Sequence, residues 1–394
     1  MKNNVFLEKA IQYSDYTAQN LSKLIQIKSL STEERDAANA IVKMMNEAGF
    51  DEARIDGLGN VIGRIGNGKK VIAIDGHIDT VDLGNLDNWD FDPLGGEIKD
   101  GYVHGRGTVD QKSGVAAFIT AGRMIKELGI ENDVTIYFTG TVMEEDCDGL
   151  CWNYIVNEEK IKPDCVIVTE PTNLNIYRGH RGRMEMKVFF YGVSSHGSAP
   201  ERGKNAIYMA SKAALEIEKL NKRLMVDDFL GKGTITVTEI KSSSPSLCAV
   251  SDYAEMHLDR RLTWGEDKEL ALNQIKEIVK EMNAKVEIVN YKQKGFTGLE
   301  YGMESYFPTW KLDEDHEVIQ TGIKSYKEIF NEEPLVDKWT FSTNGVTIRG
   351  IHGIPVIGFG PGNEVLAHAP NEKVPIDHLV KASAFYAAFC SNYK

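Results

Sequence analysis

Imidazole and carboxylate side chains recur along this chain after segments that read as β-strands. They are His77, Asp79, Glu144, Glu145, Glu170 and His368, with Asp110 at the start of a predicted helix. Nitrogen and oxygen ligands of these kinds suit zinc and similar divalent ions. The residue types therefore point to a metal centre.

Two local patterns strengthen this interpretation. His77 and Asp79 are two residues apart at the end of the strand-like run 71–75, so on an extended chain they share one face. A carboxylate behind a histidine can fix its tautomer. The glycine-rich stretch 105–114 delivers Asp110 to a helix start.

Each position alone also has an ordinary structural explanation. A histidine at a strand end can be satisfied by neighbours, an aspartate before a helix commonly caps it, and adjacent glutamates are commonly a solvated edge. All the clusters, however, follow predicted strands. Because the carboxyl ends of strands in an open α/β sheet meet at one crevice, the clusters are expected to converge. Two imidazoles and several carboxylates suit a pair of ions better than one.

Other site motifs are incomplete. The chain has no full phosphate-binding loop, dinucleotide fingerprint or serine-hydrolase elbow. Cys147 and Cys151 lack a second cysteine pair, so packing is favoured over zinc binding. Five cysteines in 394 residues do not make a disulfide framework.

The elements that must position these residues alternate between helix and strand, which predicts an α/β fold with a mixed sheet covered by helices. Helices are expected over 6–28, from a capping box at Ser31 and Glu34, and over 111–128, 315–330 and 376–391. Strands are expected over 71–75, 134–139, 165–169 and 354–359.

Between these parts the pattern changes to strand 183–191, helix 204–223, strands 234–241 and 253–262, helix 266–283 and strand 285–291. That order is the split βαβ, or ferredoxin-like, sandwich. We therefore expect a discontinuous catalytic domain, residues 1–181 and 293–394, interrupted by a second domain, residues 182–292.

Composition excludes several classes of function. A net charge of −13 and the lack of a long basic run argue against binding to nucleic acid or to an anionic membrane surface. The longest apolar runs are shorter than the roughly 20 residues that span a bilayer. No signal segment follows Met1, so a cytoplasmic location is expected.

Taken together, the motifs GHIDTV, GRGTVDQKSG, MEED, TEP, SSHGSAPERGKNAI, DRR and AHAPNE resemble the dinuclear zinc amidohydrolases and exopeptidases. That family includes acetylornithine deacetylase, succinyl-diaminopimelate desuccinylase, glutamate carboxypeptidase and aminoacylase. The resemblance covers nearly the whole chain. It implies a zinc-exopeptidase-like catalytic domain, with the inserted domain serving as a lid and in homodimer formation.

The resemblance also implies a role for each residue. His77 and Glu170 would bind one ion, Glu145 and His368 the other, and Asp110 would bridge them. Asp79 would orient His77, and Glu144 would act as the general base. The two ions would be zinc, with cobalt or manganese as alternatives.

Three further residues come from the inserted domain. His196 matches the lid histidine that reaches the substrate carbonyl from the partner subunit. Arg261 matches the arginine that holds a substrate carboxylate. Asn205, at the start of the lid helix, would bind substrate or simply cap the helix.

The chain departs from the family pattern at three places. Asp146-Cys147-Asp148 follows the acidic pair where many members have small residues, and Asn344 stands where an aspartate is usual. The third is the Leu262-Thr263-Trp264 stretch, which lacks the usual proline. These departures concern the substrate pocket.

The implied function is metal-dependent hydrolysis of an amide or peptide bond in an N-acyl amino acid or small peptide with a free carboxylate. The alternatives are an N-carbamoyl amino-acid amidohydrolase of the same architecture and a catalytically silent metal-bound binding protein. Glu144 argues against the silent protein, because binding alone needs no acid beside a complete ligand set.

Overall fold

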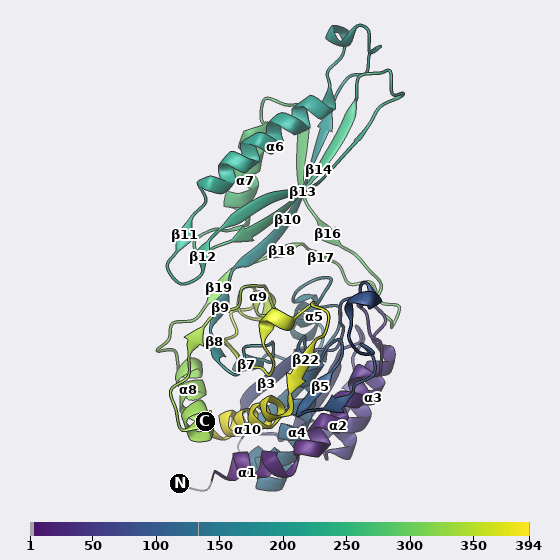
Figure 1. Ribbon diagram of the computed structural model, residues 1–394. Helices are drawn as coiled ribbons and strands as arrows, with labels where there is room; N and C mark the ends of the chain where they lie inside the picture. Colours follow the sequence, from purple (N-terminus) through teal and green to yellow (C-terminus); the bar gives the residue numbers. More distant parts are fainter. Residues whose placement is uncertain (1–3, 133, 394) are drawn as a thin grey trace.

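The computed structural model describes residues 4–132 and 134–393 and contains two main sheets (Figure 1). The larger sheet has eight strands. In spatial order they are β1 (Glu52–Ile55), β2 (Val61–Ile65), β6 (Val134–Thr141), β3 (Lys70–His77), β7 (Cys165–Val168), β21 (Val356–Gly358), β8 (Ile176–Tyr177) and β20 (Val336–Asp337).

The centre of this sheet is parallel and its flanks are partly antiparallel. β3 lies between β6 and β7 and runs parallel to both, and β21 runs parallel to β7. β2 pairs antiparallel with β1 and β6. The apolar run of β3 is buried on both faces, as expected for a central parallel strand. The predicted mixed α/β fold is confirmed.

Helices pack around this sheet (Figure 1). They are α1 (Val5–Gln12), α2 (Ser14–Ile25), α3 (Arg35–Glu47), α4 (Lys112–Leu128), α5 (Leu150–Asn157), α8 (Glu317–Phe330), α9 (Gly345–Ile348) and α10 (Ile376–Asn392). No helix among the described residues is both long and apolar enough to cross a bilayer.

Two predictions about the N-terminal helices are wrong. The helix expected over 6–28 is divided into α1 and α2 at Tyr13, whose backbone is not helical at ψ 9° and φ −98°. Ser31 and Glu34 do not form a capping box, because Ser31 lies outside α3 and its hydroxyl donates to Asp79. Glu34 instead accepts from the backbone of Thr32 and Met143.

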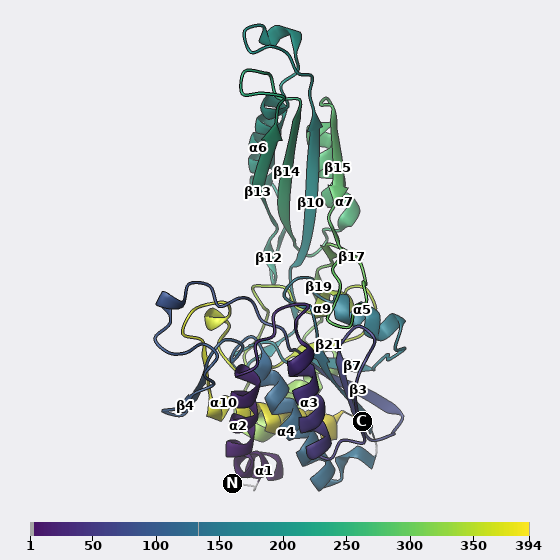
Figure 2. The same ribbon diagram turned by 90° about the vertical axis from the view of Figure 1, so that its right-hand side faces the viewer.

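The second sheet forms a separate layer with its own hydrophobic core (Figure 2). Its strand order is β13 (Thr234–Ser243), β14 (Tyr253–Leu262), β10 (Gly182–Tyr191) and β15 (Ala284–Ile288), all antiparallel. Helices α6 (Ala206–Lys222) and α7 (Lys268–Val279) cover one face. We call residues 182–288 the inserted unit.

A later strand also joins the inserted unit's sheet. β18 (Tyr306–Phe307) pairs with the first residues of β10. It lies beyond residue 292, where the sequence placed the end of the second domain. That division of the chain stays a proposal.

The remaining strands are two or three residues long and form small sheets in the loops and in the connections between the two main sheets. They are β4 (Ile98–Lys99), β5 (Tyr102–His104), β9 (Gly179–His180), β11 (Val226–Asp227), β12 (Gly231–Lys232), β16 (Asn290–Tyr291), β17 (Met303–Glu304), β19 (Trp310–Lys311) and β22 (Lys373–Pro375). β9 pairs with β19 where the chain passes between the two layers.

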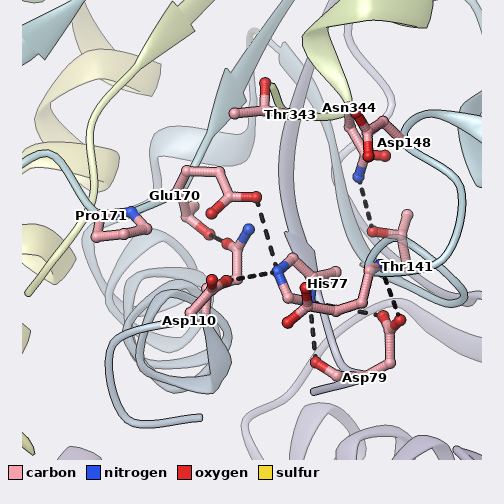
Figure 3. Close-up of polar contacts among 12 residues, drawn as sticks. His77, Asp79, Asp110, Thr141, Asp148, Glu170, Pro171, Thr343 and Asn344 are labelled. Atoms are coloured by element: carbon pink, nitrogen blue, oxygen red, sulfur yellow. Dashed lines mark hydrogen bonds and ion pairs between the residues drawn. The ribbon is translucent and has the colours of Figure 1, made fainter. Parts of the chain in front are cut away.

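Asn344 ties the centre of the large sheet to α5. Its amide nitrogen donates to Thr141 Oγ1 at 3.1 Å (Figure 3) and to Asp75 Oδ2 at 2.9 Å, and its oxygen accepts from Gly149 N at 2.9 Å. Asp75 is fully buried in β3, and burial raises its pKa. An aspartate at position 344 would therefore face a buried acid.

Asn344→Asp is expected to destabilise the fold by about 3 kcal/mol at pH 8, because two buried carboxyl groups would share one site. Burial beside Asp75 would raise the folded-state pKa of the new acid. The cost should therefore grow as pH rises above the unfolded value of about 3.9. Thermal unfolding of both proteins at pH 5.5 and 8 measures this.

The control for this prediction is Asn46→Asp, at an exposed position of α3, which should change stability little at either pH. A loss for Asn344→Asp that is equal at both pH values would contradict the electrostatic explanation.

Candidate metal centre

The predicted ligands meet at the carboxyl edge of three adjacent parallel strands. His77 is the last residue of β3. Glu144 and Glu145 follow β6, and Glu170 follows β7, so strand order alone brings their backbones together. Asp110 enters from the loop before α4.

His77 lies at the centre of the first group of ligands (Figure 3). Its Nε2 is 2.8 Å from Asp110 Oδ1 and 3.7 Å from Glu170 Oε1. Its Nδ1 is 2.9 Å from the backbone oxygen of Asp79 and 3.5 Å from that residue's carboxylate. The contact with the backbone oxygen assigns the Nδ1 proton, which leaves Nε2 free to act as a ligand.

His368 completes a second group that shares Asp110 with the first. Its Nε2 lies 2.9 Å from Glu145 Oε2 and 3.3 Å from Asp110 Oδ2. The two oxygens of Asp110 therefore face different imidazoles. That is the arrangement a bridging carboxylate requires.

Asp79 connects the first group to the acidic turn. Its Oδ2 accepts from Glu145 N at 3.1 Å and from Ser31 Oγ at 2.7 Å. The carboxylate of Asp79 therefore positions the backbone of Glu145, whereas its backbone oxygen orients the ring of His77.

The site concentrates negative charge in a dry environment. Burial raises the pKa of Glu144 and of Glu170 well above its usual range, and Asp110 adds to the effect at Glu170. Burial and Asp110 raise the pKa of Glu145 to about 7. Contacts with Asp110 and Glu145 raise the pKa of His368 to about 10.

The pKa values of His77 and Asp110 are also shifted by their charged neighbours in this site. Burial alone would lower the pKa of His77, but Asp110 and Asp79 raise it well above its ordinary value. Burial would raise the pKa of Asp110, but His368 and His77 hold it below its usual range. Without a metal ion, protons held by the two imidazoles and the glutamates therefore offset the excess of buried carboxylate charge.

Divalent cations fit this donor set. Ligand atoms of His77, Asp110 and Glu145 lie within 4.8 Å of one another, and so do those of His77, Glu144 and Glu170. Glu144 Oε1 and Glu170 Oε2 are buried without a hydrogen-bond partner. Cation binding would displace the site's protons, so affinity should fall as pH falls.

Glu372 organises the loop that carries Asp110, a role that sequence reasoning missed. Its Oε1 accepts from Val109 N at 2.6 Å and Asp110 N at 3.0 Å. Its Oε2 accepts from Gly107 N at 3.1 Å and from Arg106 Nη1 at 2.8 Å. Both Glu372 and Arg106 are buried.

Two residues near the N-terminus, Ser29 and Glu34, hydrogen-bond the backbone of the loops that carry the candidate ligands. Ser29 Oγ donates to the backbone oxygen of Ile78 at 2.7 Å. Glu34 Oε1 accepts from Met143 N at 3.0 Å, where Met143 has a positive φ of 57° just before Glu144. Sequence reasoning assigned Glu34 only to helix capping.

A cavity of about 330 Å³ opens on the ligands. Besides the metal-type residues it is lined by Asp148, Arg183, Arg261, Phe341, Ser342, Glu364 and Ala367. Arg261, which the resemblance assigned to substrate binding, therefore lines the same cavity as the candidate ligands. Its neighbour Arg260 points the other way and is buried against Glu266.

Two predicted site residues lie elsewhere. Asn205 is the N-cap of α6, where its Oδ1 accepts from Ile207 N at 2.9 Å, so it has the capping role that was one of the two alternatives. His196 is exposed in the loop after β10 and contacts Ser198. It does not reach the cavity of its own chain.

Cys147 and Cys151 are buried and free, and Cys151 Sγ donates to Asn344 Oδ1 at 3.1 Å. Neither belongs to a ligand group of the described residues.

Comparison with known proteins agrees with this geometry. Residues 73–392 match the model of peptidase family M20/M25/M40. The chain belongs to this family. As an M20 member it is a metal-dependent hydrolase.

Among its relatives, the uncharacterized protein YgeY of Escherichia coli K12 is 51% identical over 98% of this chain and 96% of that protein. A succinyl-diaminopimelate desuccinylase of Roseobacter denitrificans is 26% identical over 94% of this chain and 96% of that protein. Aminopeptidase PepT from Bacillus cereus has a similar fold, with a TM-score of 0.74, 23% identity and coverage of 96% and 98%.

In this M20 chain, Glu372→Ala is expected to lower the free energy of unfolding by about 3 kcal/mol, because it leaves the Arg106 guanidinium buried without its carboxylate. The freed Asp110 loop should also weaken zinc binding. The urea midpoint of metal-free protein and the zinc content after dialysis measure the two effects.

Glu47→Ala, on the exposed side of α3, is the control for this substitution and should change neither quantity. Normal stability with normal zinc content in Glu372→Ala would contradict the positioning role.

Proposed function

We propose that this chain cleaves the amide or peptide bond of an N-acyl amino acid or small peptide that carries a free carboxylate. The observation that carries the proposal is the joint position of two ligand groups around Asp110 and a cavity-lining arginine, Arg261. Hydrolysis of a bond near a carboxylate needs both features in one cavity.

His77, Glu170 and Asp110 would hold one ion, and Glu145, His368 and Asp110 the other. Zinc suits this nitrogen and oxygen set, as cobalt or manganese also would. When bound, the ions polarise the scissile carbonyl and make water a better nucleophile near neutral pH.

Glu144 is the residue best placed to move the proton. It is 5% exposed, lines the cavity, and its Oε1 has no hydrogen-bond partner. It would accept a proton from the attacking water and pass it to the leaving nitrogen. Burial raises the pKa of Glu144, which suits a group that must hold a proton and then give it up.

Ligand atoms of Glu144, His77 and Glu170 lie within 4.8 Å of one another, so Glu144 could also bind a metal ion. The experiment must therefore separate a role as general base from a role as ligand. Zinc-loaded Glu144→Gln should keep about two ions per chain and lose about 10²–10⁴-fold in kcat. Glu145→Gln should instead lose one ion. Elemental analysis and steady-state kinetics measure both, and a chelator should abolish wild-type turnover.

Near-normal turnover by Glu144→Gln would exclude it as the base, and loss of an ion from that variant would make it a ligand. A wild-type protein that holds two ions yet hydrolyses no N-acyl amino acid or dipeptide would support the silent binding protein. Release of ammonia and carbon dioxide would identify the N-carbamoyl alternative.

His196 is proposed to act in the site of a partner subunit. β10 begins at Gly182, next to the cavity-lining Arg183, and its ten residues run away from the larger sheet (Figure 2). At about 3.3 Å per residue, the His196 loop lies about 30 Å beyond the cavity. To act in its own chain's site, His196 would have to move across that separation. Acting in the site of a partner subunit does not require this movement.

Features of the inserted unit support a homodimer through that unit. β13 is an edge strand of ten residues with no partner on its outer side among the described segments. Ile240 on β13 and Ile207, Tyr208 and Leu215 on α6 expose apolar side chains. Long, open edges are normally covered in native proteins, and pairing about a two-fold axis would cover this one.

Under this model, His196→Ala and Glu144→Ala homodimers should each be nearly inactive, whereas mixing them with subunit exchange should restore activity. The mixed dimer contains one site with both residues intact. With random exchange, half of the dimers are mixed and each has one working site of two, so the maximum is about a quarter of wild-type activity.

Exchange must be shown independently, for example by mass spectrometry of tagged subunits. A mixture that stays inactive despite exchange, or a fully active monomer, would contradict the crossing model.

A further inference from the structure

The wall of the cavity formed by the inserted unit carries two arginines rather than one. Arg183 on β10 and Arg261 on β14 both line the cavity, together with the ligand residues. They are directly opposite each other in the antiparallel ladder. Side chains at such positions start about 4.5–5.5 Å apart, and like charges there are destabilising.

Each guanidinium is held by an acid two residues away on its own strand. Arg183 Nη2 donates to Glu185 at 2.9 Å, and Arg261 Nε and Nη2 donate to Asp259 at 2.9 and 3.1 Å. These contacts use only part of the five donors of each arginine. Arg183 Nε is buried without a hydrogen-bond partner.

Arg183 is also fixed by residues outside its own strand. Its Nη1 lies 3.9 Å from Asp148 Oδ1, in the loop after β6 of the larger sheet, and its guanidinium carbon lies 4.9 Å from the ring centre of Phe307 on β18. Asp148 in turn accepts a hydrogen bond from Ser342. The Arg183 side chain is only 18% exposed, so the guanidinium is held in place before any ligand arrives.

We propose that Arg183 and Arg261 bind one carboxylate of the substrate between them, with Arg183 as a second substrate-binding arginine. The proposal rests on the proposed function, because it concerns the same cavity. An anion between the two guanidinium groups would offset their repulsion and use their free donors.

The cavity also restricts which anion fits. Glu364 lines it without serving as a candidate metal ligand, and its Oε2 has no hydrogen-bond partner, whereas Asp148 is already paired with Arg183. A second carboxylate, or the extra charge of a phosphate, would meet the unpaired carboxylate of Glu364. The substrate class is therefore an amide with a single carboxylate near the scissile bond.

The test compares N-acetyl amino acids and dipeptides with the same compounds carrying a carboxamide in place of the carboxylate. With zinc-loaded protein, Arg183→Gln should raise KM for the carboxylates about tenfold to hundredfold with little change in kcat. It should change KM for the carboxamides by less than about twofold, since they offer no charge to lose.

Two variants serve as controls. Lys187→Gln removes a positive charge from the same strand. By strand alternation Lys187 is on the same side as Arg183, but it does not line the cavity. This variant should leave KM unchanged for both the carboxylates and the carboxamides. Arg183→Lys keeps the charge, so it should retain part of the preference for carboxylates over carboxamides that Arg183→Gln loses. Equal losses for carboxylates and carboxamides in Arg183→Gln, or no loss, would overturn the proposal.

A binding measurement separates this proposal from the proposed function. If wild-type protein hydrolyses none of the compounds, calorimetric titration of zinc-loaded protein with the same matched pairs still tests the arginine pair. Carboxylate preference in the wild type that Arg183→Gln abolishes would support it. Equal binding of both forms by the wild type would overturn it.

Discussion

Burial of several carboxylates at one edge of a sheet is the constraint on which much of this structure depends. Asp79, Asp110, Glu144, Glu145 and Glu170 lie close together with little solvent, and only two imidazoles lie among them. Uncompensated buried charge is costly, so the arrangement persists only where other parts of the fold hold it. Glu372, Ser31 and Asn344 are such supports, and none of them touches the cavity.

The sequence predicted what depends on strand ends. His77, Glu144, Glu145 and Glu170 follow strands that the apolar runs made visible, and parallel strands bring their ends together. Helix and strand bounds in both layers were close because periodicity and turn glycines define them. The break at Tyr13 was missed because both halves of the predicted helix continue the same amphipathic pattern.

Residues that act through distant partners could not be found in this way. Glu372 contacts backbone more than 260 positions earlier, and Glu34 contacts Met143. No local pattern encodes such pairs. Arg183 became visible only from the register that sets it opposite Arg261. The unusual Asp148 was noticed in the sequence, but its place beside Arg183 was not.

The order in which the strands occur along the chain bears on synthesis. β3, β6 and β7 are made before the inserted unit, whereas β21, which pairs with β7, begins only at Val356, and His368 follows it. The inserted unit is contiguous and has its own core, so it can fold while β7 still waits for its neighbour. On the ribosome, the acidic edge therefore stays open until β21 and the segment that carries His368 have emerged, so the ligand group that contains His368 is completed after the inserted unit has been made.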